Sequence, residues 1–75
     1  MDKTDVVIER INNGEYAVYF KDFYAGDILK DIKSGIWYID ITLDRFNVDF
    51  HDEANTYKLI TDSFWRYFYD NLCDF

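Results

Sequence analysis

The chain has 75 residues, of which 49% are hydrophobic and 21% aromatic, and its formal net charge at pH 7 is −7. The apolar content argues against intrinsic disorder, and the length predicts one small acidic domain over residues 1–75. The charge argues against direct binding to nucleic acid or to an anionic membrane, because both require positive charge, and it favours basic protein partners.

Cysteine usage and the first residues indicate the compartment. Cys73 is the sole cysteine and cannot form an internal disulfide, which indicates a reducing environment. No apolar run approaches the roughly 18 residues of a membrane span, and the first five residues lack the basic start of a signal peptide. We therefore expect a cytoplasmic protein.

Residues 5–23 predict a β-hairpin whose turn contains Asn13 and Gly14, since Gly14 tolerates a positive φ. A two-residue turn faces Glu9 toward the apolar side. A three-residue turn instead buries no charge, and we favour it for that reason. It places one apolar set on a single face, namely Val6, Ile8, Tyr16, Val18 and Phe20.

Residues 25–34 predict a short helix, because Ile28, Leu29 and Ile32 share one side at helical spacing. Asp27 is the candidate N-cap. A helix this short is unstable alone in water, so we expect it to dock on the rest of the domain.

Residues 36–51 predict a second hairpin, because apolar and polar positions alternate and the phase switches once, across Asp44-Arg45. A tight turn at that point pairs Leu43 with Phe46. A bent single strand with a bulge is the alternative, since Asp-Arg is a poor two-residue turn.

The same register sets Asp40 opposite Asp49, and like charges facing each other across a strand pair are destabilising. Both carboxylates pointing into water is the simplest account. A metal site is a second one, because His51, Asp52 and Glu53 lie nearby. An acidic recognition surface is the third.

Residues 53–75 predict one amphipathic helix, with Asp52 or Asn55 as its N-cap. Trp65 and Tyr69 lie at the edge of its apolar stripe, where they either pack under a loop or form an exposed aromatic surface. The stripe itself contains Tyr57, Ile60, Phe64, Tyr67, Phe68, Asn71 and Leu72.

Together these segments predict an α+β fold with the element order β-β-α-β-β-α. The two hairpins are expected to join in a four-stranded antiparallel sheet, with the long C-terminal helix packed on one face.

Motifs for chemistry are absent from the sequence. There is no glycine-rich phosphate loop and no calcium-loop spacing. His51 and Cys73 are the only histidine and cysteine, and no third group is suggested that would orient them as base and nucleophile. We therefore expect no enzyme, with no catalytic, cofactor-binding or metal-binding residue.

In size, acidity and aromatic content the chain resembles small acidic inhibitors encoded by phages and other mobile elements, including DNA mimics and anti-CRISPR proteins. The resemblance rests on these bulk properties and transfers no residue roles. It implies a non-enzymatic inhibitor that blocks a basic, nucleic-acid-binding site on a partner protein.

The residues themselves also favour an acidic contact surface, because the segment 36–52 holds four aspartates against Arg45 alone. Alternate residues on a strand lie about 6.8 Å apart and neighbouring strands about 4.8 Å apart, a spacing comparable to that of backbone phosphates. The expected partner-binding residues are Asp40, Asp44, Asp49, Asp52, Trp65 and Tyr69. The alternative function is a small homo-oligomeric assembly protein, for example a homodimer formed through the exposed aromatics of the C-terminal helix.

Overall fold

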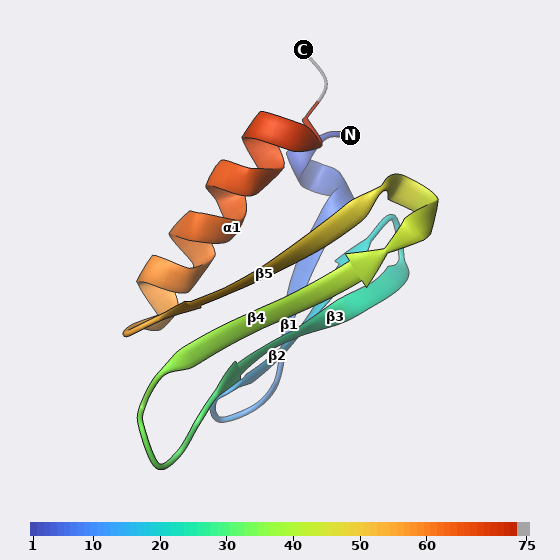
Figure 1. Cartoon of the computed structure of the whole chain (residues 1–75). Helices are drawn as coiled ribbons and strands as arrows, with labels where there is room; N and C mark the ends of the chain where they lie inside the picture. Colours follow the sequence, from blue (N-terminus) through green and yellow to red (C-terminus); the bar gives the residue numbers. More distant parts are fainter. Residues whose placement is uncertain (74–75) are drawn as a thin grey trace.

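The computed structural model describes residues 1–73 and shows a five-stranded antiparallel sheet with one C-terminal helix (Figure 1). The strands follow one another in space as they do in sequence, so every neighbouring pair is an antiparallel hairpin. The elements are η1 (Lys3–Asp5), β1 (Val6–Asn12), β2 (Glu15–Phe20), β3 (Phe23–Lys30), β4 (Trp37–Leu43), η2 (Asp44–Phe46), β5 (Val48–Ala54) and α1 (Tyr57–Asn71), where η denotes a 3-10 turn. The α+β class, the antiparallel sheet and the C-terminal helix are confirmed.

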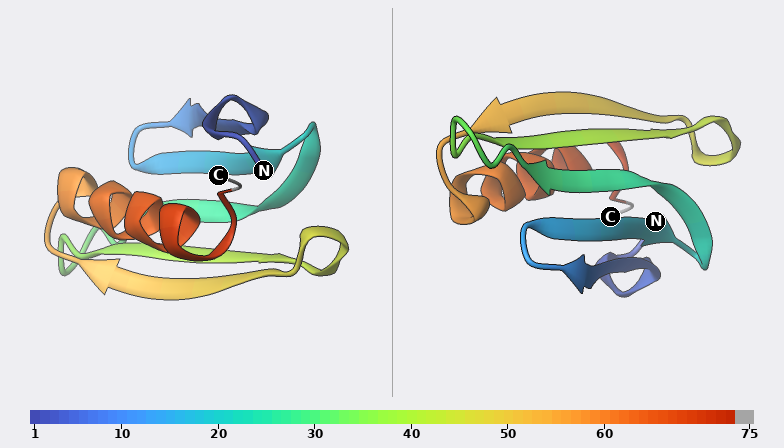
Figure 2. Two further views of the ribbon diagram at one scale, coloured as in Figure 1. Left: turned by 90° about the horizontal axis from the view of Figure 1, so that it is seen from above. Right: turned by 90° about the horizontal axis from the view of Figure 1, so that it is seen from below.

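The sheet curls around α1, so that its two faces have different surroundings (Figure 2). We call the face turned toward α1 the helix face and the opposite one the open face. The first residues of the chain lie beside the last turn of α1.

The predicted helix at residues 25–34 is wrong, and so are the four-strand count and the β-β-α-β-β-α order. The segment instead forms β3 and the turn that follows it. Ile28 is buried, whereas Leu29 points to the open face and Ile32 is 94% exposed in the turn, so their helical spacing was coincidental. Because β3 hydrogen-bonds to β2 and β4 on its two sides, tertiary pairing outweighs the local pattern.

In the first hairpin, the favoured register is confirmed. Val6 pairs with Phe20 and Ile8 with Val18, and Gly14 has a φ of +77°. The predicted three-residue turn is wrong, because Asn12 pairs with Glu15 across the two-residue turn Asn13-Gly14, and a bulge between Arg10 and Asn12 produces the favoured register instead.

In the second hairpin, Leu43 pairs with Val48, so the predicted pairing with Phe46 is wrong by two residues. The chain turns through η2 and then Asn47, which adopts the left-handed conformation with φ 57° that asparagine tolerates. The longer turn leaves Phe46 to pack against Phe23, with ring centroids 5.9 Å apart. Since the shift is an even number of residues, the faces of β4 and β5 are as predicted.

The helix α1 begins at Tyr57, and its N-cap is Thr56, whose hydroxyl accepts a hydrogen bond from the Leu59 amide at 3.1 Å. The prediction of a start at residue 53, capped by Asp52 or Asn55, is therefore wrong, because β5 continues to residue 54. Residues 74–75 of the predicted helix lie outside the described part of the chain. No described helix is long and apolar enough to span a membrane.

The core lies between α1 and the helix face. Apolar side chains of this size each contribute about 1.5–3 kcal/mol to folding when they are fully buried. The largest fully buried side chains are Phe20, Phe64, Phe68, Ile28, Ile39, Ile41, Ile60, Val18 and Val48.

Candidate functional site

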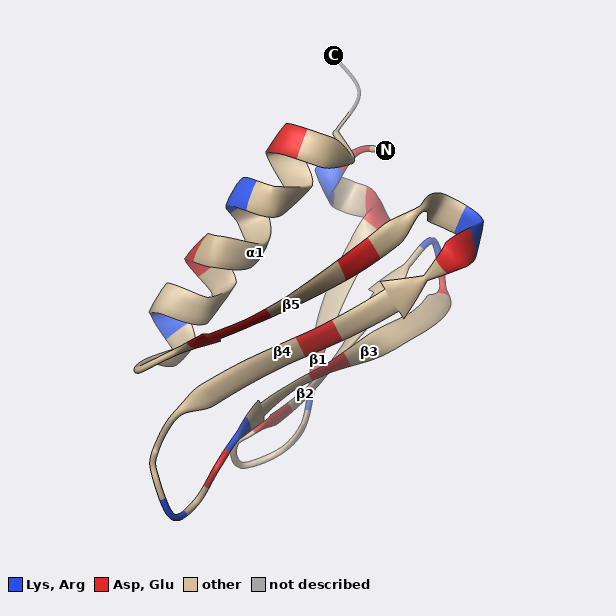
Figure 3. Ribbon diagram, in the orientation of Figure 1, with Lys and Arg blue, Asp and Glu red and all other residues tan. Residues whose placement is uncertain are grey.

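The open face carries a concentration of carboxylates. The pairing places Asp27 opposite Asp40, and Asp40 opposite His51, across three neighbouring strands. Figure 3 shows acidic positions on β3, β4 and β5. Strand residues that lie opposite one another share a face, which assigns the rest of the set. The carboxylates of the open face are Glu9, Glu15, Asp27, Asp40, Asp49 and Glu53.

Positive charge is placed elsewhere. The five strands contain two basic residues, Arg10 and Lys30, and these pair with Tyr16 and Trp37, which pack against the core on the helix face. The strand positions of the open face therefore combine acidic side chains with no lysine or arginine.

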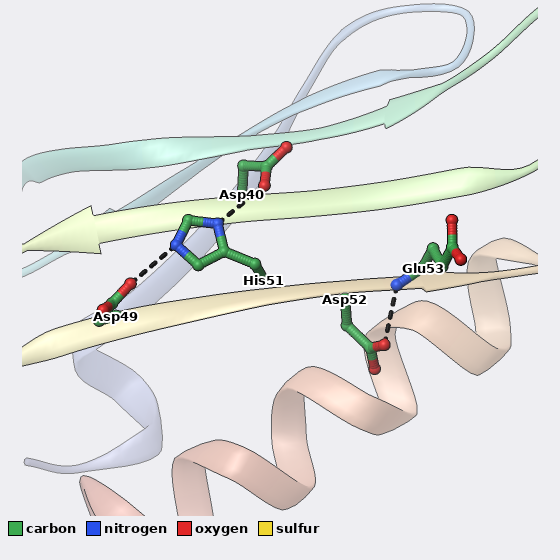
Figure 4. Close-up of polar contacts among 5 residues, drawn as sticks. All are labelled: Asp40, Asp49, His51, Asp52 and Glu53. Atoms are coloured by element: carbon green, nitrogen blue, oxygen red, sulfur yellow. Dashed lines mark hydrogen bonds and ion pairs between the residues drawn. The ribbon is translucent and has the colours of Figure 1, made fainter.

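His51 lies between two of these carboxylates. Its Nδ1 is 2.8 Å from Asp40 Oδ1 and its Nε2 is 2.7 Å from Asp49 Oδ1 (Figure 4). The hydrogen bond to Asp40, followed by the one to Asp49, raises the pKa of the imidazole above its ordinary value. Both ring nitrogens can donate only in the protonated form, which these two acceptors favour.

The predicted opposition of Asp40 and Asp49 is wrong, because the residue opposite Asp49 is Thr42. The longer turn after β4 moves each partner by two positions and brings His51 opposite Asp40. The cross-strand repulsion expected from the sequence is thus replaced by an imidazole that bridges both acids.

Apolar side chains interleave with the acids of the open face. Val7, Tyr24, Leu29 and Tyr38 point to this side, and each is between 36% and 55% exposed. The face therefore offers both charge for long-range attraction and apolar area for contact, as protein-binding surfaces do.

Asp27 is held in place within this face. The Tyr24 hydroxyl donates a hydrogen bond of 2.6 Å to Asp27 Oδ2. That bond is the main cause that raises the pKa of Tyr24 to about 12. Tyr24 consequently stays a neutral donor at physiological pH, and its hydroxyl holds the Asp27 carboxyl in position.

The predicted acidic residues do not all share one surface. Asp40 and Asp49 lie together on the open face, whereas Asp44 belongs to the turn η2. Asp52 pairs with Ile39 and lies on the helix face, where its carboxylate accepts hydrogen bonds from the Ser63 hydroxyl and the Glu53 amide. Figure 4 shows Asp52 turned toward α1, so it joins β5 to the helix.

The two predicted aromatic contacts differ in their surroundings. Trp65 is half-buried against Phe64 and Phe68, with ring centroids 4.9 and 5.5 Å away, and the Lys3 ammonium lies 5.3 Å from its ring centroid. Of the two alternatives for Trp65, packing beneath another segment, here the N-terminal one, therefore applies. Tyr69 is 41% exposed on the surface of α1.

Sequence reasoning missed Asp27, which it assigned to a helix cap. The adjacent aromatics Phe23 and Tyr24 were the available signal, because aromatic residues favour strands. Read as a strand, residues 26–30 alternate and place Asp27 beside Asp40, whereas the bulge at Ala25 shifts the alternation of the residues before it.

His51 and Cys73 do not meet. His51 lies on the open face, while Cys73 packs against the core on the other side of the sheet. Within residues 1–73, no three histidine, cysteine, aspartate or glutamate side chains are grouped to hold a metal ion. Asp52 and His51, considered together for a metal site, lie on opposite faces of β5.

Compared with known proteins, the chain matches no family model, no curated protein and no solved structure.

Proposed function

We propose that the chain is a non-enzymatic binding protein whose open face occupies a basic, nucleic-acid-binding site on a partner protein, as DNA-mimic and anti-CRISPR inhibitors do. The observation that carries the proposal is the sign of the charge on the open face. Its strand positions present carboxylates from all five strands and no lysine or arginine.

The spacing of the acids supports mimicry of a phosphate backbone. Asp27 and Asp40 lie on neighbouring strands, about 4.8 Å apart, and Asp49 follows on the next strand two residues before His51. A rigid sheet holds these charges in a fixed array, which limits the entropy lost when a partner binds.

Charge and apolar area have separate roles in this proposal. The carboxylates attract a basic partner over a distance and speed its association. Exposed apolar side chains such as Leu29 and Tyr38 then hold the complex by excluding water. We propose that the encounter takes place in the cytoplasm, where nucleic-acid-processing proteins work and a chain with a single cysteine is expected.

Affinity capture with elution by duplex DNA tests the proposal. The immobilised chain is incubated with nuclease-treated bacterial lysate, and bound proteins are eluted first with duplex DNA and then with salt. We expect the DNA eluate to contain a basic, nucleic-acid-processing protein, because the chain and the duplex DNA compete for the same site on that protein. Recovery of no such protein at low or high salt would contradict the proposal.

Two variants of equal charge make the capture specific to the open face. Neutralising Asp27, Asp40 and Asp49 to asparagine removes three charges from that face while keeping oxygen acceptors for Tyr24 and His51. The matched control carries Asp44→Asn, Asp62→Asn and Asp70→Asn, which change the same net charge elsewhere. Only the open-face variant is expected to lose the partner.

The alternative is a homo-oligomer formed through α1. It is favoured by the exposure of Leu59 (52%) and Tyr69 (41%) on the helix surface. Light scattering at high micromolar concentration separates the two proposals, since a strict monomer rules out self-assembly and leaves these side chains for a foreign partner.

A further inference from the structure

A second candidate site lies apart from the open face, where the β1–β2 turn, the end of β3, the start of β4 and the start of α1 meet. A pocket of about 460 Å³ opens there. We propose that this pocket binds a small organic anion that has an aromatic or branched apolar body and a carboxylate. The pocket is lined by Asn13, Gly14, Tyr16, Lys30, Ile32, Trp37 and Tyr57.

Three aromatic rings from three separate elements form the apolar part of the pocket. Tyr16 of β2 and Tyr57 of α1 lie with ring centroids 4.5 Å apart, and Trp37 of β4 meets Tyr57 edge-on at 5.2 Å. Each ring is half-buried and packs against the core, so the surface is preformed rather than assembled by the ligand.

The polar groups around these rings are suited to an anion. Lys30 is the single charged residue of the lining, which contains no carboxylate despite the acidity of the chain. Among residues 1–73, its ammonium forms no ion pair with an acidic side chain. A ligand carboxylate therefore meets one positive charge and no competing negative one within the lining.

Neutral donors add hydrogen bonds that a carboxylate oxygen and an amide oxygen can both accept. Asn13 Oδ1 accepts a hydrogen bond from Arg10 at 3.1 Å, which leaves the amide nitrogen of Asn13 for the ligand. Burial raises the pKa of Tyr57, so its hydroxyl stays protonated and able to donate. These groups and Lys30 together form a donor-rich rim above an aromatic floor.

Backbone contacts position Lys30 at the pocket. Its amide donates a 2.8 Å hydrogen bond to the Gly14 carbonyl, and its Cβ lies 3.2 Å from where a Cβ on Gly14 would be. The stem of Lys30 thus rests on the β1–β2 turn. Ile32, 94% exposed beside the pocket, is an apolar side chain that the body of a ligand would cover.

Three probes of one shape and different charge test the inference: phenylacetate, phenylacetamide and phenethylamine. Binding is followed by amide chemical shifts of the isotopically labelled chain. We expect phenylacetate to shift the amides of Gly14, Ile32 and Tyr57 saturably, and to bind about fivefold more tightly than the neutral amide, the effect of one exposed ion pair. Equal or tighter binding of the amine would overturn the inference, as would the absence of a saturable shift with phenylacetate.

Matched variants assign the charge preference. Lys30→Gln is expected to make phenylacetate and phenylacetamide bind equally, whereas Lys33→Gln, which removes a charge from the turn after β3 and outside the lining, keeps the preference. A preference that survives Lys30→Gln would contradict the assignment. The open-face variant should bind phenylacetate as the wild type does, so this site and the proposed function can fail independently.

Discussion

His51 is the residue through which two acids of the open face are joined. Because it is the chain's only histidine, its titration can be followed without assignment ambiguity by the imidazole proton shifts. We expect a pKa above the ordinary 6.5, since Asp40 and Asp49 both accept from the ring. Replacing both acids by asparagine should return the pKa toward 6.5; an unchanged value would show that the bridge does not form in solution.

The same bridge predicts how stability depends on pH. A group whose pKa is raised by folding stabilises the fold fully below its unfolded value, near 6.5, and that contribution is lost as pH rises through the folded value. Urea denaturation between about pH 6 and pH 9 should therefore show that the free energy of unfolding of the wild type declines, whereas that of His51→Gln lacks this decline. An identical decline in both proteins would argue against the bridge between His51 and the two acids.

Gly26 is a second residue with a defined role, since the backbones of β3 and β4 approach closely at this point. A Cβ placed on Gly26 would lie 2.0 Å from the Asp40 carbonyl oxygen, and the residue has a φ of +155°. Gly26→Ala should cost about 3 kcal/mol or more, because the sheet itself must shift.

Gly35→Ala is the control for that substitution. Gly35 also has a positive φ, +76°, but nothing lies within 4 Å of its added Cβ. Only backbone strain of about 1 kcal/mol is then expected. Equal losses for both variants in urea denaturation would mean that the close approach at Gly26 is unimportant.

At the scale of the elements, alternation and helical periodicity identified both hairpins and α1, because each of these has one buried and one solvated side. They failed at β3. Its stability comes from hydrogen bonds to β2 and β4, which leave no trace in local spacing, while Ile28, Leu29 and Ile32 mimic a helix. Element ends also depended on particular contacts, such as the cap at Thr56.

The errors in the candidate site follow from the same cause. Asp40 and Asp49 were found because their strands alternate clearly, but their true partners depend on the length of the turn between them. Asp27 was missed with β3, and Asp52 was misplaced because its strand continues further than predicted.

Packing of α1 predicts different consequences for its two predicted contact aromatics. Trp65 packs against two core phenylalanines and lies near Lys3, so Trp65→Ala should cost about 2 kcal/mol of stability. Tyr69 is 41% exposed, and Tyr69→Ala should cost less than about 1 kcal/mol. Thermal melting of both variants tests this difference. A fall of only a degree or two in the melting temperature of Trp65→Ala would favour Trp65 as a partner-contact residue instead.

At the scale of the whole molecule, the acidic open face should control how fast a basic partner associates. Asp40→Asn combined with Asp49→Asn is expected to slow association and flatten its dependence on salt, while changing dissociation little. Stopped-flow mixing with the captured partner measures both rates. Asp62→Asn with Asp70→Asn, on α1, provides a control of equal charge. An equal effect from that pair would show that net charge, and not the position of the acids on the open face, controls the association rate.

Amide hydrogen exchange of the chain, with and without the captured basic protein, tests most directly whether the open face is the binding surface. The account predicts added protection in β3, β4 and β5 around Asp27, Asp40 and His51, with the exposed side of α1 unaffected. Protection confined to α1 near Leu59 and Tyr69, with the open face exchanging as in the isolated chain, would contradict it.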